Sequence, residues 1–178
     1  FQGHFRDMNE VNKIHNPVIM ELGPGDSLLS MVYSRKFSKE KFYFLDVSDF
    51  ASKDLDLYSK LQKKLEKDNY FSYKLKRPFD SFENLLNFYN AKYLTSGLKS
   101  LRKVEDHSID YIFSHSVLEH VRKYELNTLI EEMHRVLKPN GVISHNVNYK
   151  DHLGESLNNL RFSEKIWESN LFAKSGFY

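Results

Sequence analysis

A glycine-rich turn between two apolar segments is the stretch of this sequence with the clearest chemical potential. In ELGPGDSL, Gly23 and Gly25 flank Pro24, between a short apolar run and a run with helical spacing. Glycine lets the backbone approach a ligand closely, and a helix N-terminus offers free N–H groups to an anionic ligand. Asp46 ends the next apolar run, where a carboxylate can accept hydrogen bonds from ribose hydroxyls. Each feature alone is more often structural, but together they predict a nucleoside ligand.

The same turn argues against two other phosphate-containing ligands. A dinucleotide fingerprint is G-x-G-x-x-G, and its third glycine allows a helix to pack closely on a strand beneath a pyrophosphate. Leu28 stands at that sixth position. A triphosphate-binding loop needs G-x-x-x-x-G-K-[ST], which the sequence lacks. The sequence therefore favours a nucleoside over a dinucleotide or a nucleoside triphosphate.

Apolar runs of strand length alternate with segments of helical spacing, and these elements must position the turn and the acid. Asp80 and Glu83 are spaced like a capping box, and Pro139 and Gly141 are stop signals for the clearest helix. The alternation predicts an α/β fold, with an open, mostly parallel sheet and helices on both faces. Ligands bind such sheets at the carboxyl ends of the strands. The expected strands are residues 17–22, 41–47, 91–95, 108–117 and 142–147, and the expected helices are residues 27–35, 51–69, 80–90 and 124–137.

The length of 178 residues suits one domain with a core of its own. The opening FQGH resembles the remnant of a cleavable tag, so we expect residues 1–4 to lie outside the fold and residues 5–178 to form a single domain. Residues 51–90 are longer than a connection between two strands requires. They are rich in Tyr, Phe and Lys, so we expect a helical insertion there. It could serve as a lid, as an acceptor-recognition element or as a homodimer surface.

The composition excludes several classes of function. The net charge is only +2, so the basic run at residues 60–77 is interpreted as a solvated helix face, and no nucleic-acid partner is expected. The sequence has no Cys, which excludes disulfides, thiolate nucleophiles and zinc bound by cysteine, and fits a reducing compartment. No apolar run approaches the ~20 residues of a membrane span, and no signal peptide is recognised. We expect a cytoplasmic protein.

The ordered motifs resemble those of class I S-adenosylmethionine-dependent methyltransferases, which have a Rossmann-like fold. ELGPGDSL is similar to their first motif, FYFLDV to their second strand, SIDYIFSHSVLEHV to their fourth strand, and EMHRVLKPNGVIS to the helix and strand that follow. The resemblance implies S-adenosyl-L-methionine as the cofactor. The family fold ends in an antiparallel strand pair, of which KSGFY looks like the start, so we expect this pair to be missing from the chain.

The resemblance also implies roles for individual residues. Glu21 and the turn from Gly23 through Pro24 to Gly25 shape the pocket for the methionine part, and Asp46 binds the ribose. The segment after the third strand often supplies an acid near the adenine, but here it reads LTSG. Ser96 and Gly97 are therefore expected to serve in its place. Ser114, at the end of the fourth strand, is expected to face the reacting centre.

A narrower resemblance concerns the acceptor of the methyl group. GPGDSL, YLTSGLKSLR, SHSVLEHVRKYE and SHNVNYKDHLGESLNNLRFSEKIWES together resemble bacterial methyltransferases associated with cell-surface polysaccharide synthesis. This implies methyl transfer to an oxygen of a small molecule or of a glycan precursor. One alternative is a binding module that has lost catalysis and acts as a subunit of a complex. Another is a nucleotide-sugar or NAD-dependent enzyme of similar topology, which Leu28 disfavours.

Histidines are the candidate proton acceptors, because a hydroxyl acceptor benefits from a general base and His titrates near neutral pH. His115 is the first choice, since it ends the fourth strand, and His152 and His145 follow. His120 is interpreted as a packed residue that fixes a turn. His145, Asp151 and His152 lack fixed helical spacing, so no metal site is predicted.

A polar and aromatic cluster near the end of the chain is the candidate substrate site. Asn158, Arg161 and Trp167 could bind a sugar or an anionic acceptor through an amide, a guanidinium and an aromatic ring. A helix capped by Ser163, with Arg161 in a salt bridge, explains the same residues equally well. Both interpretations stay open at the level of sequence.

Overall fold

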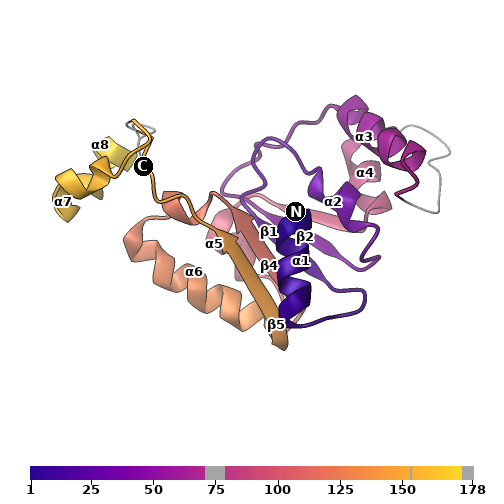
Figure 1. Cartoon of the computed structure of the whole chain (residues 1–178), viewed down its shortest axis with the longest axis horizontal. Helices are drawn as coiled ribbons and strands as arrows, with labels where there is room; N and C mark the ends of the chain where they lie inside the picture. The colour runs from indigo at the N-terminus through magenta and orange to yellow at the C-terminus, as the bar shows by residue number, and fades with distance from the viewer. Residues whose placement is uncertain (71–78, 153, 174–178) are drawn as a thin grey trace.

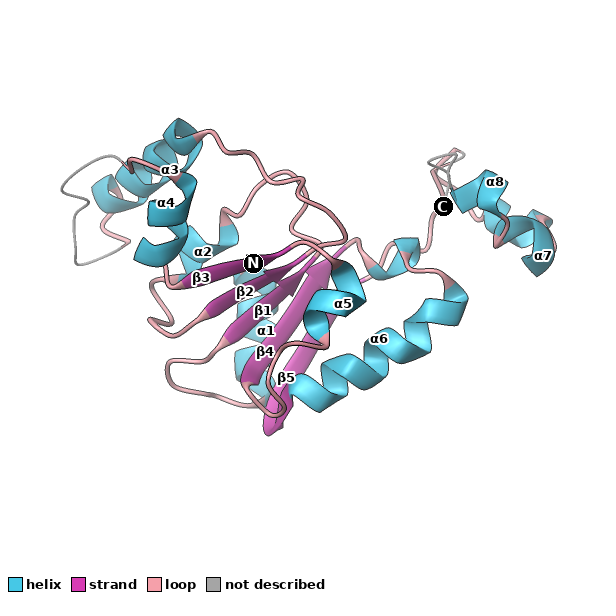
Figure 2. Ribbon diagram, turned by 180° about the vertical axis from the view of Figure 1, so that it is seen from behind, coloured by secondary structure: helices cyan, strands magenta, loops and turns pink. Residues whose placement is uncertain are grey.

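The sheet of this protein is parallel throughout, as expected for an α/β fold. A computed structural model describes residues 1–70, 79–152 and 154–173 of the chain. Its strands run in the order β3-β2-β1-β4-β5, and every neighbouring pair is parallel (Figures 1 and 2). The order reverses between β1 and β4, which is where ligands bind in open α/β sheets. The strands are β1 (Ile19–Leu22), β2 (Phe42–Leu45), β3 (Ala91–Leu94), β4 (Ile109–His115) and β5 (Leu137–Asn146).

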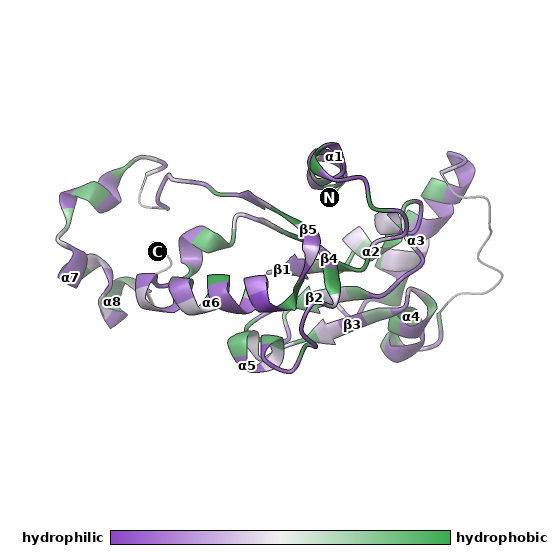
Figure 3. Cartoon of the chain, turned by 90° about the horizontal axis from the view of Figure 1, so that it is seen from below, coloured by the Kyte–Doolittle hydropathy of each residue, from purple (hydrophilic) through white to green (hydrophobic). Residues whose placement is uncertain are grey.

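Helices cover both faces of the sheet, as the sequence predicts. Helices α1 (Gln2–Val11), α2 (Ser30–Ser34) and α3 (Leu55–Lys67) lie on one face, and α5 (Gly97–Leu101) and α6 (Lys123–Val136) lie on the other (Figure 3). Helix α4 (Phe82–Phe88) packs beside β3. Within the described ranges, no helix is long and apolar enough to cross a membrane.

Aromatic side chains fill the core on the α1 face, which explains the high Phe and Tyr content. Phe42 and Phe44 of β2 and Phe113 of β4 are almost fully buried, and Phe5 of α1 lies against Tyr111 with ring centroids 5.7 Å apart. Each fully buried side chain of this size stabilises the fold by roughly 1.5–3 kcal/mol. This packing joins α1 to the centre of the sheet.

Aliphatic side chains fill the core on the opposite face. Met20 and Leu22 of β1 contact a cluster that includes Leu129, Met133 and Val136 of α6, which recur at helical spacing. Ile130 is 48% exposed. It follows Leu129 by one residue, which is a rotation of about 100° around the helix, so its side chain leaves the buried stripe.

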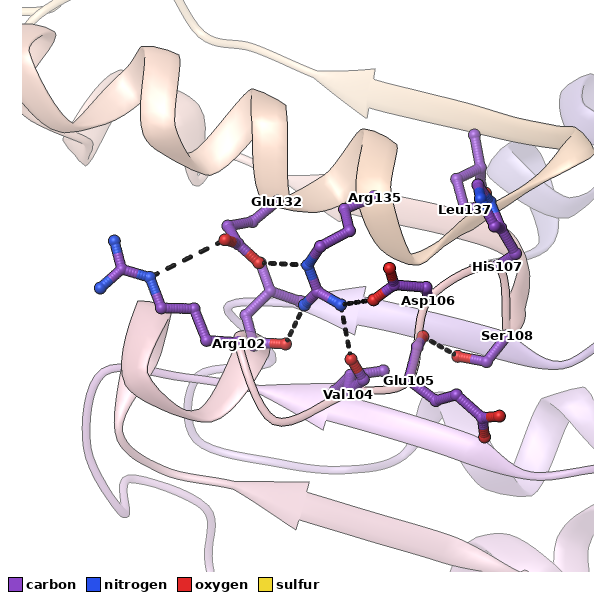
Figure 4. A network of polar contacts seen from close by, with 10 residues as sticks. Arg102, Val104, Glu105, Asp106, His107, Ser108, Glu132, Arg135 and Leu137 are labelled. Carbon is purple, nitrogen blue, oxygen red and sulfur yellow. Dashed lines mark hydrogen bonds and ion pairs between the residues drawn. The ribbon is translucent and has the colours of Figure 1, made fainter.

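The network around Arg135 joins α6 to the end of α5 (Figure 4). The guanidinium donates to the carbonyl oxygens of Leu101 and Val104 at 3.0 and 2.8 Å, and it pairs with Asp106 and Glu132. Arginine suits this place because its planar group offers several donors in fixed directions. The network holds the end of α5 against the last turn of α6 just before β4 begins, at the edge of the sheet opposite the carboxyl ends of the strands.

The first residues of the chain take part in the fold, contrary to the expectation for residues 1–4. Residues from Gln2 onward form α1, and the rings of Phe1 and Phe113 are 5.6 Å apart. The side chain of His4 also lies 2.8 Å from Ser144 Oγ of β5. That FQGH derives from a tag, with the domain beginning at residue 5, stays a prediction.

Two local predictions were also wrong, and both have simple causes. The helix before KPNG ends at Val136, as predicted, but the strand that follows was predicted to begin at Val142, whereas β5 begins at Leu137 and includes Pro139. Proline is tolerated there because β5 is an edge strand of the described sheet. Helix α4 is capped by Ser81, whose Oγ accepts from the backbone N of Asn84 at 3.0 Å, so Asp80 lies one residue too early to cap it.

The C-terminal segment extends past the carboxyl end of β5 and returns to the start of α6 (Figure 2). It contains η2 (Asn158–Arg161), α7 (Glu164–Trp167) and α8 (Asn170–Ala173). Lys123 of α6 pairs with Glu164 at 2.9 Å, and Arg122 donates to Asn170 at 3.1 Å. The expected strand at KSGFY falls on residues 174–178, outside the described residues. In the expected insertion, α3 and α4 flank residues 71–78, which also lie outside them.

Candidate functional site

The glycine turn after β1 adopts a conformation that favours glycine at two positions. Gly23 and Gly25 have φ of +59° and +67°, in the left-handed region. A Cβ on Gly23 would lie 2.5 Å from Cγ2 of Val117, whereas a Cβ on Gly25 would meet no atom of the described residues within 4 Å. The backbone therefore passes close to Val117 at Gly23 and borders open space at Gly25.

Asp46 follows β2 and lies beside this turn. Its Oδ2 accepts a hydrogen bond from the backbone N of Gly25 at 3.3 Å, and its Oδ1 accepts one from Val47 at 2.7 Å. The backbone of Asp46 contacts the start of α5, because Gly97 N donates to the carbonyl oxygen of Asp46 at 2.8 Å. One acid thus connects the glycine turn with the start of α5.

A first cavity of about 160 Å³ opens where these segments meet, at the reversal of strand order. Three of its residues were predicted from the sequence, namely Gly23, Asp46 and Gly97. Sequence reasoning missed its apolar wall, since nothing local distinguishes these side chains from core residues. The lining consists of Leu22, Gly23, Leu45, Asp46, Val47, Gly97, Leu98, Val117, His120, Val121, Glu125 and Leu129.

Glu21 lies beneath the glycine turn, on the face of β1 opposite the first cavity. It pairs with the side-chain hydroxyl of Ser30 in α2. Burial raises the pKa of Glu21 to about 7, against the opposing effects of the Ser30 hydrogen bond and the chain's N-terminal amine. The carboxyl group therefore helps to hold α2 below the turn.

Besides Glu21, four residues that we predicted to bind the cofactor are not part of the described lining of the first cavity. Pro24 and Gly25 belong to the turn itself, and Ser96 precedes α5. Ser114 is fully buried in β4, and its Oγ lies 2.7 Å from Nδ1 of His145. Burial lowers the pKa of His145, and the positive charge of His4 lowers it further.

His115, the first choice for a general base, does not face either cavity. Side chains alternate along β4, and His115 lies on the same face as Tyr111 and Phe113, which α1 covers. Its ring centroid is 6.1 Å from that of His4 in α1. His115 was predicted from its position at the end of a strand, and this position alone could not show on which face of the sheet its side chain lies.

A second cavity of about 400 Å³ lies next to the first, and His120 lines both. It includes His152 and Trp167 of the predicted site residues. Asn158 lies behind its wall, where its Nδ2 donates to Asp151 Oδ1 at 3.4 Å, and Arg161 donates to Asn158 Oδ1 at 3.4 Å. The lining consists of Leu118, Glu119, His120, Leu126, Ile130, Val147, Asn148, Tyr149, Lys150, Asp151, His152, Asn159 and Trp167.

His120 and His152 stack on each other at the boundary of the two cavities. Their ring centroids are 5.3 Å apart and the rings are 4° from parallel. His120 lies on the short helix η1 (Leu118–His120) and is exposed, so the prediction of a packed histidine was wrong. Among the described residues, no group of three or more His, Cys, Asp or Glu side chains is placed to hold a metal ion.

A family model decides the assignment. Residues 20–144, which include the glycine turn, Asp46 and His120, match the model described as a methyltransferase domain. The chain belongs to this family. No curated protein matches this methyltransferase domain.

Solved structures similar to the methyltransferase domain include phospholethanolamine N-methyltransferase 2 of Haemonchus contortus, in complex with phosphomonomethylethanolamine and S-adenosylhomocysteine. The identity is 14%, with 80% of this chain and 27% of that chain covered, and a TM-score of 0.47. A protein of Methanococcus maripaludis, assigned as an S-adenosyl-L-methionine-dependent methyltransferase, is 18% identical, with 96% and 67% covered and a TM-score of 0.49. PKMT2 of Rickettsia typhi, in complex with AdoHcy, is 15% identical, with 80% and 24% covered and a TM-score of 0.46. The methyltransferase domain thus spans from about a quarter to two thirds of the length of these proteins.

The residues that match the family model include only part of the lining of the second cavity. The match stops at residue 144, whereas Asn148, His152, Asn159 and Trp167 lie beyond it. The first cavity is therefore built from family sequence, and one wall of the second is built from the segment that follows.

Proposed function

We propose that this domain transfers a methyl group from S-adenosyl-L-methionine to an oxygen of a small molecule or of a glycan precursor. The observation that carries the proposal is the first cavity, which joins Gly23, Asp46 and Gly97 at the reversal of strand order. A ligand that combines an apolar base with a ribose matches this lining. S-adenosyl-L-methionine, when bound, supplies a methyl group that is already activated on a positively charged sulfur.

The residues of the first cavity fit the parts of this cofactor. Leu45, Leu98 and Leu129 offer an apolar wall for a flat base, and the carboxylate of Asp46 can accept hydrogen bonds from ribose hydroxyls. Glu21 and the turn from Gly23 through Pro24 to Gly25 are proposed to shape the remainder of the site. Ser96, Gly97 and Ser114 are proposed as further contacts.

Binding requires the chain to open slightly at the turn. A cavity of about 160 Å³ is smaller than the roughly 300–1,000 Å³ of typical cofactor sites. Val117 lies over Gly23, and the N–H of Gly25 is bonded to Asp46. We propose that Val117 moves aside and that Asp46 exchanges this bond for contacts with the ligand.

Among the predicted general bases, the second cavity favours His152. His152 lines that cavity, where an acceptor would lie beside the first. His145 is engaged with Ser114, and its pKa is lowered by burial, so it is a weaker candidate. His115 lies on the α1 face. We propose His152 to take up the proton of a hydroxyl acceptor, and Trp167, Asn158 and Arg161 to form or support the acceptor site.

Calorimetry and turnover test the proposal in two stages. We expect the chain to bind S-adenosylmethionine and S-adenosylhomocysteine but not NAD. Transfer of a labelled methyl group to a panel of sugar nucleotides and lipid-linked glycans then distinguishes an enzyme from a binding module. Binding of NAD alone would refute the cofactor assignment. We also propose that the protein acts in bacterial polysaccharide synthesis, that it is cytoplasmic and that it forms a homodimer.

A further inference from the structure

We propose that the second cavity binds a sugar-like acceptor through its hydroxyl groups, with Glu119 and Asn159 accepting their hydrogen bonds and Trp167 packing against the ring. The inference rests on the proposed function, because it takes this cavity as the acceptor site beside the cofactor. It goes beyond the family, since Asn159 and Trp167 lie outside residues 20–144.

Two oxygen atoms in residues that line this cavity have no hydrogen-bond partner within the described part of the chain. These are Oε2 of Glu119 and Oδ1 of Asn159, and both are buried. An unpaired buried acceptor costs about 1–3 kcal/mol. A ligand that donates hydrogen bonds would relieve this cost, whereas an apolar or anionic ligand would not.

Hydrogen bonds to neighbouring residues hold Glu119 and Asn159 in the wall of the cavity. Oε1 of Glu119 accepts from the backbone N of Asn148 at 3.2 Å, and the backbone N of Asn159 donates to Asp151 Oδ2 at 3.0 Å. A small rotation about the last side-chain torsion, which has a broad energy minimum, turns either oxygen toward the cavity.

The remaining lining favours hydroxyl donors over a cationic amine. The lining holds two carboxylates, Glu119 and Asp151, and the ammonium group of Lys150 offsets one of these negative charges. Asp151 already accepts hydrogen bonds from Asn158 and Asn159, so the lining does not present a purely anionic surface to a cation. The two unpaired oxygens lie on separate segments, so a ligand with several donors satisfies both at once. The half-buried ring of Trp167 offers a flat apolar surface. A polyhydroxylated ring meets all three conditions.

His120 places this site next to the chemistry. It follows Glu119 directly and lines both cavities, and it stacks on His152. A hydroxyl that is held by Glu119 therefore lies beside the histidine pair, at the boundary with the first cavity. We assign His120 as a positioning residue that orients His152.

Trp167 makes the proposal directly measurable, because it is the only tryptophan among the 178 residues. The full chain is titrated with a series of methyl hexopyranosides while its fluorescence is recorded, with and without saturating S-adenosylhomocysteine. Ethanolamine serves as the cationic probe. We expect a saturable change with at least one glycoside and none with ethanolamine.

Glu119→Gln is the decisive variant, because it keeps an oxygen for Asn148 and replaces the other oxygen with a hydrogen-bond donor. We expect it to weaken glycoside binding by about tenfold, the loss of about 1.4 kcal/mol that one such hydrogen bond contributes. Asn159→Asp keeps an acceptor and should bind within about threefold of the native chain. Glu131→Gln makes the same chemical change on the exposed surface of α6 and should have no effect.

The outcomes separate this inference from the proposed function. If S-adenosylhomocysteine binds but no glycoside changes the fluorescence, this inference fails while the proposed function stands. Equal glycoside affinity in Glu119→Gln and the native chain also overturns it, as does binding of ethanolamine alone. If S-adenosylhomocysteine itself does not bind, the proposed function fails. Unchanged S-adenosylhomocysteine affinity in Glu119→Gln shows that the variant folds.

Discussion

The carboxylate of Asp46 accepts a hydrogen bond from the backbone N–H of Gly25, with 3.3 Å between N and Oδ2. This bond joins the end of β2 to the turn that follows β1. Because Asp46 also lines the first cavity, a ligand that reaches this carboxylate also changes the turn. The acid and the glycine turn therefore act as one unit.

Replacement of Asp46 tests this unit. Asp46→Ala removes the proposed ribose acceptor, and hydrogen bonds to charged groups contribute about 1.5–3 kcal/mol each. We expect the affinity for S-adenosylhomocysteine to fall by about 10–100-fold in calorimetry. Asp49→Ala is the control, because Asp49 is exposed and pairs with Lys53 at 2.6 Å. This variant should bind S-adenosylhomocysteine with the affinity of the native chain. The same affinity in both variants would contradict the ribose role of Asp46.

The contact between Gly23 and Val117 predicts a coupled pair of substitutions. Gly23→Ala adds a Cβ at 2.5 Å from Val117 Cγ2 and also forces alanine into the left-handed region, which costs about 1–2 kcal/mol. Val117→Ala removes the clash but not the backbone strain. Urea unfolding of the single and double variants should therefore give a coupling of about 0.5–3 kcal/mol, with the double variant more stable than the sum predicts.

Gly25 provides the matched comparison for this cycle. A Cβ there meets no described atom within 4 Å, so Gly25→Ala should carry only the backbone cost. We expect no coupling between Gly25→Ala and Val117→Ala. Additive effects in the Gly23 cycle would mean that Val117 does not pack against the turn in solution.

Arg102 and Arg135 both pair with Glu132, and we expect Arg135 to contribute more to the free energy of unfolding. Arg135→Ala removes the side-chain donor to the carbonyl oxygens of Leu101 and Val104, and only the Leu101 oxygen keeps a backbone donor, the N–H of Val104 at 2.9 Å. We expect a loss of about 2 kcal/mol in the free energy of unfolding. Arg135→Lys should recover only part of it, since an ammonium group lacks the fixed donor geometry. Arg102→Ala breaks one exposed ion pair of 3.8 Å and should cost about 0–1 kcal/mol. Equal losses for the two alanine variants would contradict the network of Figure 4.

The buried carboxyl of Glu21 predicts how stability depends on pH. Its pKa rises from 4.5 in the unfolded chain to about 7 in the fold, so the folded state binds more protons between these values. The contribution of Glu21 to stability is therefore complete below pH 4.5 and is lost as the pH rises to about 7, a change of roughly 3 kcal/mol.

Glu21→Gln isolates this effect. We expect urea unfolding to show the variant more stable than the native chain at pH 8 by up to roughly 3 kcal/mol, with a much smaller difference at pH 4. Glu10→Gln changes a carboxylate that is 73% exposed and should leave the pH profile unchanged. A profile of Glu21→Gln parallel to that of the native chain would show that Glu21 titrates normally.

The sequence by itself determined the strand order along the chain, the parallel α/β fold and the glycine turn with its acid. These features depend on local patterns, such as the apolar run of β1, the positive φ that glycine permits at Gly23 and Gly25, and the position of Asp46 at the end of β2. The parallel sheet then brings the carboxyl ends of neighbouring strands to one edge. For this reason Gly23 and Asp46 could be predicted to lie together.

Only the tertiary structure decided which side chains share a cavity. His115 and Ser114 are adjacent in sequence but lie on opposite faces of β4, because side chains alternate along a strand. His120 and His152 are far apart in sequence, and they stack only because η1 and the segment after β5 meet beyond the sheet. Such contacts arise from long-range packing, which leaves no local pattern in the chain.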